Sequence, residues 1–401
     1  MIMPEPKVRF RRDDGSSYPA WKEYSISDLF TKIGAKNKDG SNTNVITNSA
    51  EFGLIPQREY FDKDIAVDGN TGNYTIIQTG DFVYNPRKSS YAPMGPFNCY
   101  RLEEDGIVSP LYSCLRPKGV LNPEYLLWYF QTDKWHGYVN DHGAQNGARH
   151  DRVGMTDKIL MRIPVTAPCE EEQQKIADFL SSVDEIISAS EAELQNLETH
   201  KKAVMKKIFS QEVRFKRDDG TEFPEWEEKV FTDVAQLING RAYSADEMLE
   251  SGKYMILRVG NLFSNNEYYY SDMELDEDKY IDDGDLIYAW SATFGPRIYH
   301  GEKCIYHYHI WKVIPHSVEK DYFLHFLYAD VDNLQSELNG GTMKHITKEI
   351  MEKRIVPLPR KDEQRLIADF LSDFDEAIAA AKKELELWKE LKKGLLQQMF
   401  V

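Results

Sequence analysis

The stretch Glu171–Ile187, EEQQKIADFLSSVDEII, recurs in the same chain as Asp362–Ile378, DEQRLIADFLSDFDEAI. The two copies agree at 11 of 17 positions and lie 191 residues apart. A second repeat precedes them, because VRFRRDDG at Val8–Gly15 returns as VRFKRDDG at Val213–Gly220 with 7 of 8 positions identical. The interiors of the two halves share little sequence. Constant ends around divergent interiors predict one scaffold that carries two different domains.

Each copy of the helical stretch begins a heptad repeat of apolar residues that continues for about five heptads, the pattern of a coiled coil. In the first helix the predicted seam contains Ile176, Leu180, Val183, Ile187, Leu194 and Leu197. In the second helix it contains Ile367, Leu371, Phe374, Ile378, Leu385 and Trp388. The alternative is two amphipathic helices that pack separately on globular domains. Because register and length agree between the copies, the sequence favours the coiled coil.

The repeats divide the chain into four segments of an α+β protein. We expect a first globular domain over 1–168, a helix over 169–210, a second domain over 211–360 and a second helix over 361–401. A helix of ~37 residues is ~55 Å long, whereas the ends of a compact domain lie close together. The end of the first helix should therefore lie near the start of the second. This predicts a long antiparallel coiled-coil pair with a domain at each end and internal pseudo-twofold symmetry.

The composition is that of a folded protein, with 41% hydrophobic residues and a net charge of −17. Residues 1–168 carry 20 basic and 20 acidic side chains, whereas residues 211–360 carry 17 and 28. This acidity argues against a simple nucleic-acid binder. No signal peptide, membrane span or CxxC spacing is present. We therefore expect a cytoplasmic protein whose cysteines stay reduced and that contacts no membrane.

The motifs that accompany catalysis are missing from the sequence. It contains no GxxxxGK[ST] loop, no GxGxxG that opens a helix and no GxSxG elbow. His307 and His309 flank Tyr308 and would share one face of a strand. A half-buried polar strand is favoured there over a metal site. The sequence thus predicts no catalytic residue and no metal ligand, and a chain that positions something instead of transforming it.

The helix motif, its heptads and its duplication together resemble the specificity subunit of type I restriction-modification systems. The motif has the form P-x-x-E-Q-x-x-I-A-x-x-L-x-x-x-D, and a Pro-x-Trp start opens both halves at Pro19 and Pro224. The matching residues are Glu172, Gln173, Ile176, Ala177, Leu180 and Asp184, and again Glu363, Gln364, Ile367, Ala368, Leu371 and Asp375. The resemblance covers the whole chain. The first copy of the motif departs from the second in the linker before the helix.

The resemblance implies that each globular domain is a target recognition domain for one part of a split site on double-stranded DNA. The paired helices would act as a spacer and as the docking surface for two methyltransferase subunits, to which restriction subunits are added. No cofactor would bind this chain, because S-adenosylmethionine, Mg and ATP belong to its partners. Because the two interiors diverge, the halves of the site should differ, and the bases between them should go unread.

Polar, basic and aromatic residues of the divergent interiors are the candidates for DNA contact, since Arg pairs with guanine and Asn or Gln with adenine. In the first domain they are Arg87, Lys88, Ser89, Ser90, Tyr91, Gln145, Asn146, Arg149 and His150. In the second domain they are Arg241, Tyr243, Trp290, Ser291, Arg297, Lys344 and His345. Two other functions fit the charge and the helices: an interaction scaffold without DNA binding, and an acidic DNA mimic. A mimic needs carboxylates at phosphate-like spacing, however, and the first domain is neutral.

Overall fold

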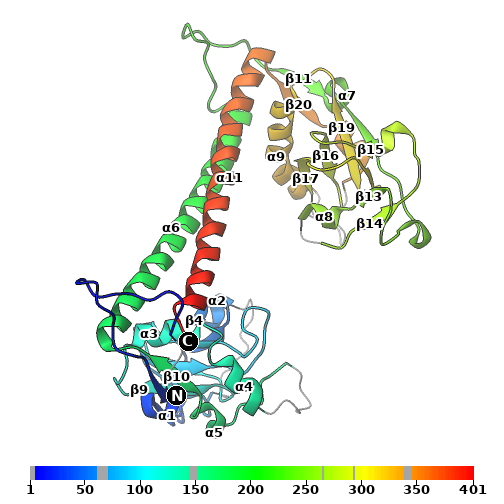
Figure 1. Cartoon of the computed structure of the whole chain (residues 1–401). Coiled ribbons are helices and arrows are strands. Elements are labelled where there is room, and N and C mark those ends of the chain that lie inside the picture. The colour runs from blue at the N-terminus through cyan, green and yellow to red at the C-terminus, as the bar shows by residue number, and fades with distance from the viewer. Residues whose placement is uncertain (1–4, 61–70, 144–150, 264–265, 292–293, 338–345) are drawn as a thin grey trace. The chain divides into compact units, whose positions relative to one another are not determined.

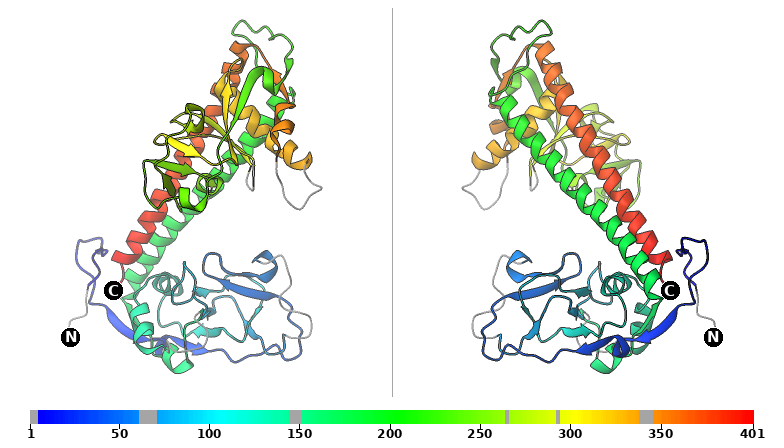
Figure 2. Two further views of the ribbon diagram at one scale, coloured as in Figure 1. Left: turned by 90° about the vertical axis from the view of Figure 1, so that its right-hand side faces the viewer. Right: turned by 90° about the vertical axis from the view of Figure 1, so that its left-hand side faces the viewer.

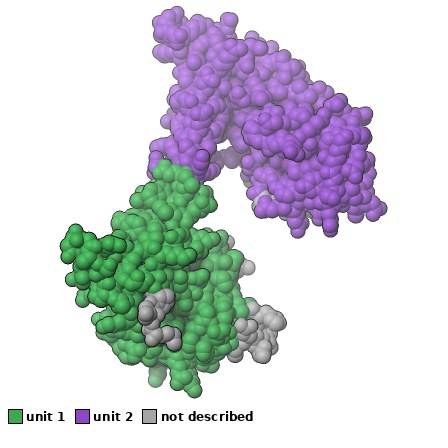
Figure 3. Space-filling model, viewed as in Figure 1, with its two compact units in different colours: residues 1–190, 384–401 green, residues 191–383 purple. Residues whose placement is uncertain are grey.

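The computed structural model describes residues 5–60, 71–143, 151–263, 266–291, 294–337 and 346–401. The chain forms two compact units, one of residues 1–190 with 384–401 and one of residues 191–383 (Figure 3). Each unit therefore contains one globular domain and the adjoining parts of two long helices (Figure 1). The fold is α+β, as predicted.

The first domain is built from short strands and helices around two four-stranded sheets. One sheet has the order β2-β9-β6-β7 and the other β4-β3-β8-β5, while β1 pairs with β10. The strands are β1 (Lys22–Ser25), β2 (Phe30–Lys32), β3 (Val45–Ser49), β4 (Gly53–Pro56), β5 (Thr75–Ile77), β6 (Phe82–Tyr84), β7 (Phe97–Cys99), β8 (Gly106–Val108), β9 (Ser113–Pro117) and β10 (Pro164–Ala167). The helices are α1 (Ile26–Leu29), α2 (Gln57–Tyr60), α3 (Pro123–Phe130), α4 (His136–His142) and α5 (Asp157–Leu160).

The second domain repeats this topology although its sequence differs. Its sheets have the orders β12-β19-β16-β17 and β14-β13-β18-β15, and β11 pairs with β20. The strands are β11 (Glu227–Val230), β12 (Ala235–Asn239), β13 (Tyr254–Leu257), β14 (Tyr269–Ser271), β15 (Tyr280–Ile281), β16 (Leu286–Ala289), β17 (Gly295–Ile298), β18 (Cys304–Tyr306), β19 (Ile310–Pro315) and β20 (Ile355–Leu358). The helical segments are α7 (Phe231–Val234), η1 (Ala245–Glu247), α8 (Val259–Phe263), η2 (Glu277–Lys279), α9 (Lys320–Glu337) and α10 (Lys348–Glu352). The domain interiors are thus equivalent strand by strand.

The matching Gly-Asp turns before β6 and β16 show the equivalence at atomic detail. Asp81 accepts a hydrogen bond from the Gln78 N–H at 2.7 Å, and Asp285 accepts one from the Asp282 N–H at 2.8 Å. Gly80 and Gly284, which precede the two aspartates, have φ values of +89° and +84°, a region that favours glycine. This local chemistry explains why these two stretches are among the few recognisable matches between the interiors.

Two long helices, α6 (Glu170–Phe209) and α11 (Lys361–Gln398), join the domains in sequence. In the second unit Glu198 pairs with Lys382 and Lys201 pairs with Asp375, so the partner number falls as the residue number rises. The helices are therefore antiparallel there, and they lie side by side in Figures 1 and 2. The antiparallel β11·β20 ladder supports this arrangement, because it brings the two ends of the second domain together.

The seam positions are less exposed than the helix faces around them. Ile176, Leu180, Val183, Ile187, Ile367, Leu371, Ile378 and Leu385 are buried, and Leu194, Leu197, Phe374 and Trp388 are half-buried. The first turns have a second role, however. Ile176 and Leu180 belong to the core of the first domain, and Ile367 and Leu371 belong to the core of the second. Each helix is thus anchored in a globular domain where it begins.

A repeated set of contacts fixes each helix start, and we call it the helix latch. Glu172 is fully buried and accepts hydrogen bonds from Arg9 Nε and an Arg9 terminal nitrogen at 2.9 and 3.0 Å. Glu363, also fully buried, accepts the equivalent bonds from Arg214 at 3.3 and 3.0 Å. These contacts explain why VRF-x-RDDG and the helix motif recur together, since each supplies one charge of a buried pair.

A glutamine completes each latch. Gln173 donates to the Pro168 carbonyl at 2.9 Å and accepts from the Asn122 N–H at 2.8 Å. In the second half Gln364 donates to Pro359 at 2.7 Å and accepts from the Glu319 N–H at 2.8 Å. The Glu-Gln pair of the motif therefore ties the helix start to the segment before α3 or α9.

Candidate nucleic-acid interface

In the first domain the predicted residues after β6 form an exposed loop. Arg87, Lys88, Ser89, Ser90 and Tyr91 are all exposed, Tyr91 by 71%. The loop is closed at Gly95, whose φ is +82° and where a Cβ would lie 2.1 Å from the Asn85 carbonyl oxygen. Only glycine fits that approach.

A second segment of the chain runs beside this loop. The Lys88 N–H donates to the Asp151 carbonyl at 2.9 Å, and the Val153 N–H donates to the Pro86 carbonyl at 2.8 Å. Residues 151–153 directly follow the other predicted group in the sequence. That group, Gln145, Asn146, Arg149 and His150, lies outside the described residues. The described segment that follows this group therefore lies beside the loop after β6.

The second domain brings together the equivalent segments. Trp290 follows β16 as the Arg87 loop follows β6, and its carbonyl accepts a hydrogen bond from the Ile346 N–H at 3.3 Å. Residue 346 directly follows Lys344 and His345, which lie outside the described residues. In the first domain the loop after β6 meets the segment that leads to α5. In the second domain the loop after β16 meets the segment that leads to α10.

The turn 307–309 borders the same place. It connects β18 to β19, so the prediction of a strand there is wrong. Trp290 Nε1 donates to the Tyr308 carbonyl at 2.8 Å, and the Trp290 and His309 ring centroids lie 4.9 Å apart. The turn thus adds aromatic and imidazole groups to the interface.

Three predicted residues of the second domain are less free than the sequence suggested. Ser291 and Tyr243 are buried, with exposed fractions of 7% and 9%. Arg241 is half-buried, and its guanidinium bonds the Glu247 carboxylate at 2.6 Å. The pKa of Glu247 is lowered chiefly by that hydrogen bond. Neighbouring groups of the fold therefore cover or pair these three candidates, and their contact with DNA stays a prediction.

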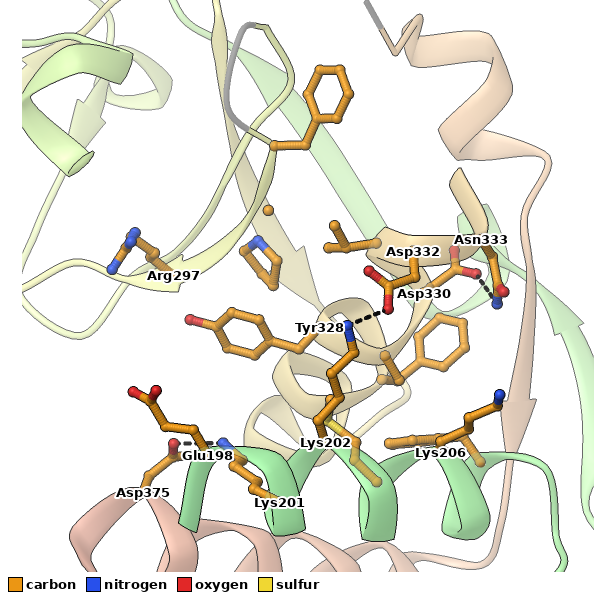
Figure 4. Close-up of a pocket in the computed structure, with 18 of the residues that line it drawn as sticks. Glu198, Lys201, Lys202, Lys206, Arg297, Tyr328, Asp330, Asp332, Asn333 and Asp375 are labelled. Carbon is orange, nitrogen blue, oxygen red and sulfur yellow. Dashed lines mark hydrogen bonds and ion pairs between the residues drawn. The ribbon is translucent and has the colours of Figure 1, made fainter. Parts of the chain in front are cut away.

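Arg297 lies at a different part of the second unit. It is exposed on β17, 4.5 Å from the Phe263 ring centre, and it lines a cavity of about 750 Å³ between β17, α9 and the two long helices (Figure 4). Three lysines of this cavity form ion pairs, Lys201 with Asp375, Lys202 with Asp332 and Lys382 with Glu198. Carboxylates neutralise these three lysines, and a fourth lysine, Lys206, also lines the cavity.

Within the ranges that the structure describes, no cluster of three or more His, Cys, Asp or Glu residues is arranged to hold a metal ion. None of the helices described combines the length and apolarity needed to cross a membrane.

The comparison with protein families decides what kind of chain carries this arrangement. The model of the type I restriction modification DNA specificity domain matches twice, over residues 19–199 and 224–387. The chain belongs to this family. The double match coincides with the duplication seen in the sequence and in the sheets, and it makes the chain a specificity subunit in the sense of type I restriction-modification systems. Specificity subunits are the non-catalytic, sequence-recognising chains of those systems.

Relatives of known name agree with this assignment. The chain is 28% identical over 303 residues to the putative type I restriction enzyme MjaX specificity subunit of Methanocaldococcus jannaschii, covering 70% of this chain and 68% of the relative. It is 26% identical over 318 residues to the type I restriction enzyme MjaVIII specificity subunit of the same organism, covering 74% and 73%.

Solved structures show the same fold. A chain from a structure of complex assembly and conformational transition in a type I R-M system has a TM-score of 0.60 at 16% identity, over 95% of this chain and 98% of that one. The type I restriction-modification S subunit from M. genitalium has a TM-score of 0.53 at 14% identity, over 99% of both chains. At this identity the likeness concerns the fold alone.

Proposed function

We propose that each domain of this specificity subunit reads one half of a bipartite, asymmetric site on double-stranded DNA. The observation that carries the proposal is the pairing of two divergent segments at the same place on a repeated scaffold: the loop after β6 with 151–153, and the loop after β16 with 346. Repeated backbone positions with different side chains suit two readers of unlike sequence. Exposed Arg87 and Lys88 supply donors in the first domain.

The long helices set the distance between the two readers and dock two methyltransferase subunits, to which restriction subunits are added. In this proposal the exposed flanks of α6 and α11 face those partners, while the seam residues face each other. S-adenosylmethionine, Mg and ATP are used by the partner subunits and not by this chain. The assembly works in the cytoplasm, where its DNA lies and where free cysteines such as Cys99 and Cys304 stay reduced.

The acidity of the chain fits a divided task. With a net charge of −17, the isolated subunit should bind DNA weakly, because non-specific affinity comes from neutralised phosphates. The methyltransferase partners would supply much of that contact. The acidic DNA mimic and the scaffold without DNA binding are less well supported, since the first domain carries equal numbers of basic and acidic residues.

Purification of the tagged chain from its own cells, followed by footprinting, tests the proposal. Methyltransferase subunits should co-purify, and the complex should protect two stretches of unlike sequence separated by an unread gap. Co-purification without any protected DNA would favour the scaffold. Competition with DNA for a DNA-binding protein would favour the mimic.

A further inference from the structure

A small cavity in the second domain borders the turn 307–309. It has a volume of about 330 Å³ and is lined by Tyr243, Met248, Arg258, Val259, Gly260, His307 and His309. The turn also carries the contact between His309 and Trp290, with ring centroids 4.9 Å apart. The cavity is therefore continuous with the candidate interface of this domain.

Two polar atoms of the cavity residues lack partners among the described residues. The Tyr243 hydroxyl and the Arg258 Nε are both buried and form no hydrogen bond there. The Tyr243 side chain as a whole is 9% exposed. A buried donor without a partner costs free energy of about 1–3 kcal/mol, and native proteins contain few of them. Two such donors in the lining of one cavity indicate a ligand that accepts hydrogen bonds.

The charges around the cavity favour an anion. Arg258 stacks on the Tyr269 ring at 4.4 Å and donates to the Glu267 carbonyl at 3.2 Å. Among the described residues it has no carboxylate partner, although its domain has an excess of acidic side chains. His307 is held neutral, because burial, His309 and Arg258 lower its pKa to about 4. At neutral pH the cavity thus presents one uncompensated guanidinium, a hydroxyl and a neutral imidazole.

We propose that this cavity binds a phosphate of the DNA backbone beside the half-site read by the second domain. The inference rests on the function proposed above and adds the contact that positions the DNA. Charged donors to phosphate oxygens set the register of a protein on DNA, and hydrogen bonds from arginine to phosphate are among the strong ones. The corresponding turn of the first domain, between β8 and β9, carries Ser109, Pro110 and Leu111 in place of the histidines.

The test is DNA binding by the assembled methyltransferase complex across 50 to 200 mM salt, on cognate and on unrelated duplexes. Arg258→Gln should lower the affinity for the cognate and the unrelated duplex by the same factor, about 10-fold or more. It should also reduce the slope of log affinity against log salt by about one. Tyr243→Phe, which removes only the hydroxyl, should weaken both about 5-fold. Lys253→Gln is the matched control, because this exposed lysine of the same domain already pairs with Glu274. It should leave the affinity for both duplexes unchanged.

Three results would overturn the proposal. Loss of cognate binding alone would show that the cavity reads a base. Unchanged binding in both variants would show that DNA does not reach it. For Arg258→Gln, a lowered affinity with an unchanged salt slope would exclude a phosphate. A wild-type complex without preference for any sequence would instead refute the proposed function, so the two failures are distinguishable. Tyr243→Phe keeps the shape of the side chain and so guards against misfolding as the cause of any loss.

Discussion

The helix latch predicts that Glu172→Gln lowers the free energy of unfolding far more than the same change at the adjacent Glu171. Glu172→Gln keeps the shape of the side chain but removes the charge that Arg9 bonds at 2.9 and 3.0 Å. Glu172 is 0% exposed and Arg9 is 13% exposed, so the substitution leaves a largely buried guanidinium without its carboxylate. Breaking a buried pair in this way costs about 3–5 kcal/mol. Since Arg9 retains an exposed contact with Glu5, we expect Glu172→Gln to lower the free energy of unfolding by about 3 kcal/mol, the lower end of this range.

The control is the preceding residue. Glu171 is 71% exposed and lies 3.5 Å from Arg12, which is 39% exposed. Surface pairs of this kind contribute about 0–1 kcal/mol. Glu171→Gln removes the same charge from the same helical turn, so it separates the effect of the latch from the effect of net charge and of the helix dipole.

Urea unfolding followed by tryptophan fluorescence measures the difference, because Trp21 is buried in the same domain. With a slope of about 2–3 kcal/mol per M, Glu172→Gln should lower the midpoint of the first unit by about 1 M. Glu363→Gln should act likewise on the second unit, with Asp362→Asn as its exposed control. Equal midpoints for Glu172→Gln and Glu171→Gln would refute the idea that the latch stabilises the helix start.

Three further predictions concern the helices. Leu194→Asp combined with Leu385→Asp should abolish assembly with the methyltransferase, because an unpaired carboxylate in the seam costs several kcal/mol; a complex that survives in size-exclusion chromatography would contradict the coiled coil. His325 is buried and its pKa is lowered to about 4, chiefly by burial, so the stability it contributes is complete above its unfolded pKa of about 6.5 and is lost as the pH falls toward 4. Wild type should lose about 3 kcal/mol more than His325→Gln between pH 6.5 and 4 in urea unfolding, and parallel pH curves would be the contrary result. Inserting four residues near Ala192 adds ~6 Å and should lengthen the tolerated gap by roughly 1–2 bp at ~3.4 Å each, whereas a mapped methylation site with an unchanged gap would show that the helices do not set it.

The helices were predictable because their signal is long and periodic. Seam residues such as Leu180 and Leu371 repeat every seven positions in both copies, and a pattern of that length has few alternative readings. Their second contact was not predictable. Leu180 and Leu371 also enter the cores of the domains, and heptad spacing cannot distinguish a domain from a partner helix as the covering surface.

The strands of the domain interiors were not predictable, because each strand is short and shows no periodic signal. Strands such as β6 and β7 are three residues long, and so short a run has no clear period. Their equivalence with β16 and β17 is set by tertiary pairing and not by side-chain identity. Only the Gly-Asp turns, where local backbone geometry restricts the residue type, kept a match that sequence could detect.

The sequence could locate the loops of the candidate interface, but it could not show the contacts of individual residues in them. The loop after β6 is exposed as expected, since proline and polar residues follow a short apolar strand. Tyr243 and Arg241 look equally available in sequence, yet one is buried and the other pairs with Glu247. Such pairings depend on neighbours brought together by the fold. Arg258 was missed because it stands alone in the sequence, whereas the motif around His307 drew attention for a different chemistry.

Domain exchange with methylation-site mapping tests the central claim most directly. Residues 22–160 would be replaced by the equivalent domain of a related subunit, and the modified sites would be mapped genome-wide in cells that carry the complete system. The account predicts that one half of the recognised sequence changes, while the other half and the gap stay as they were. A change in both halves together, or in neither, would contradict two independent readers on one scaffold.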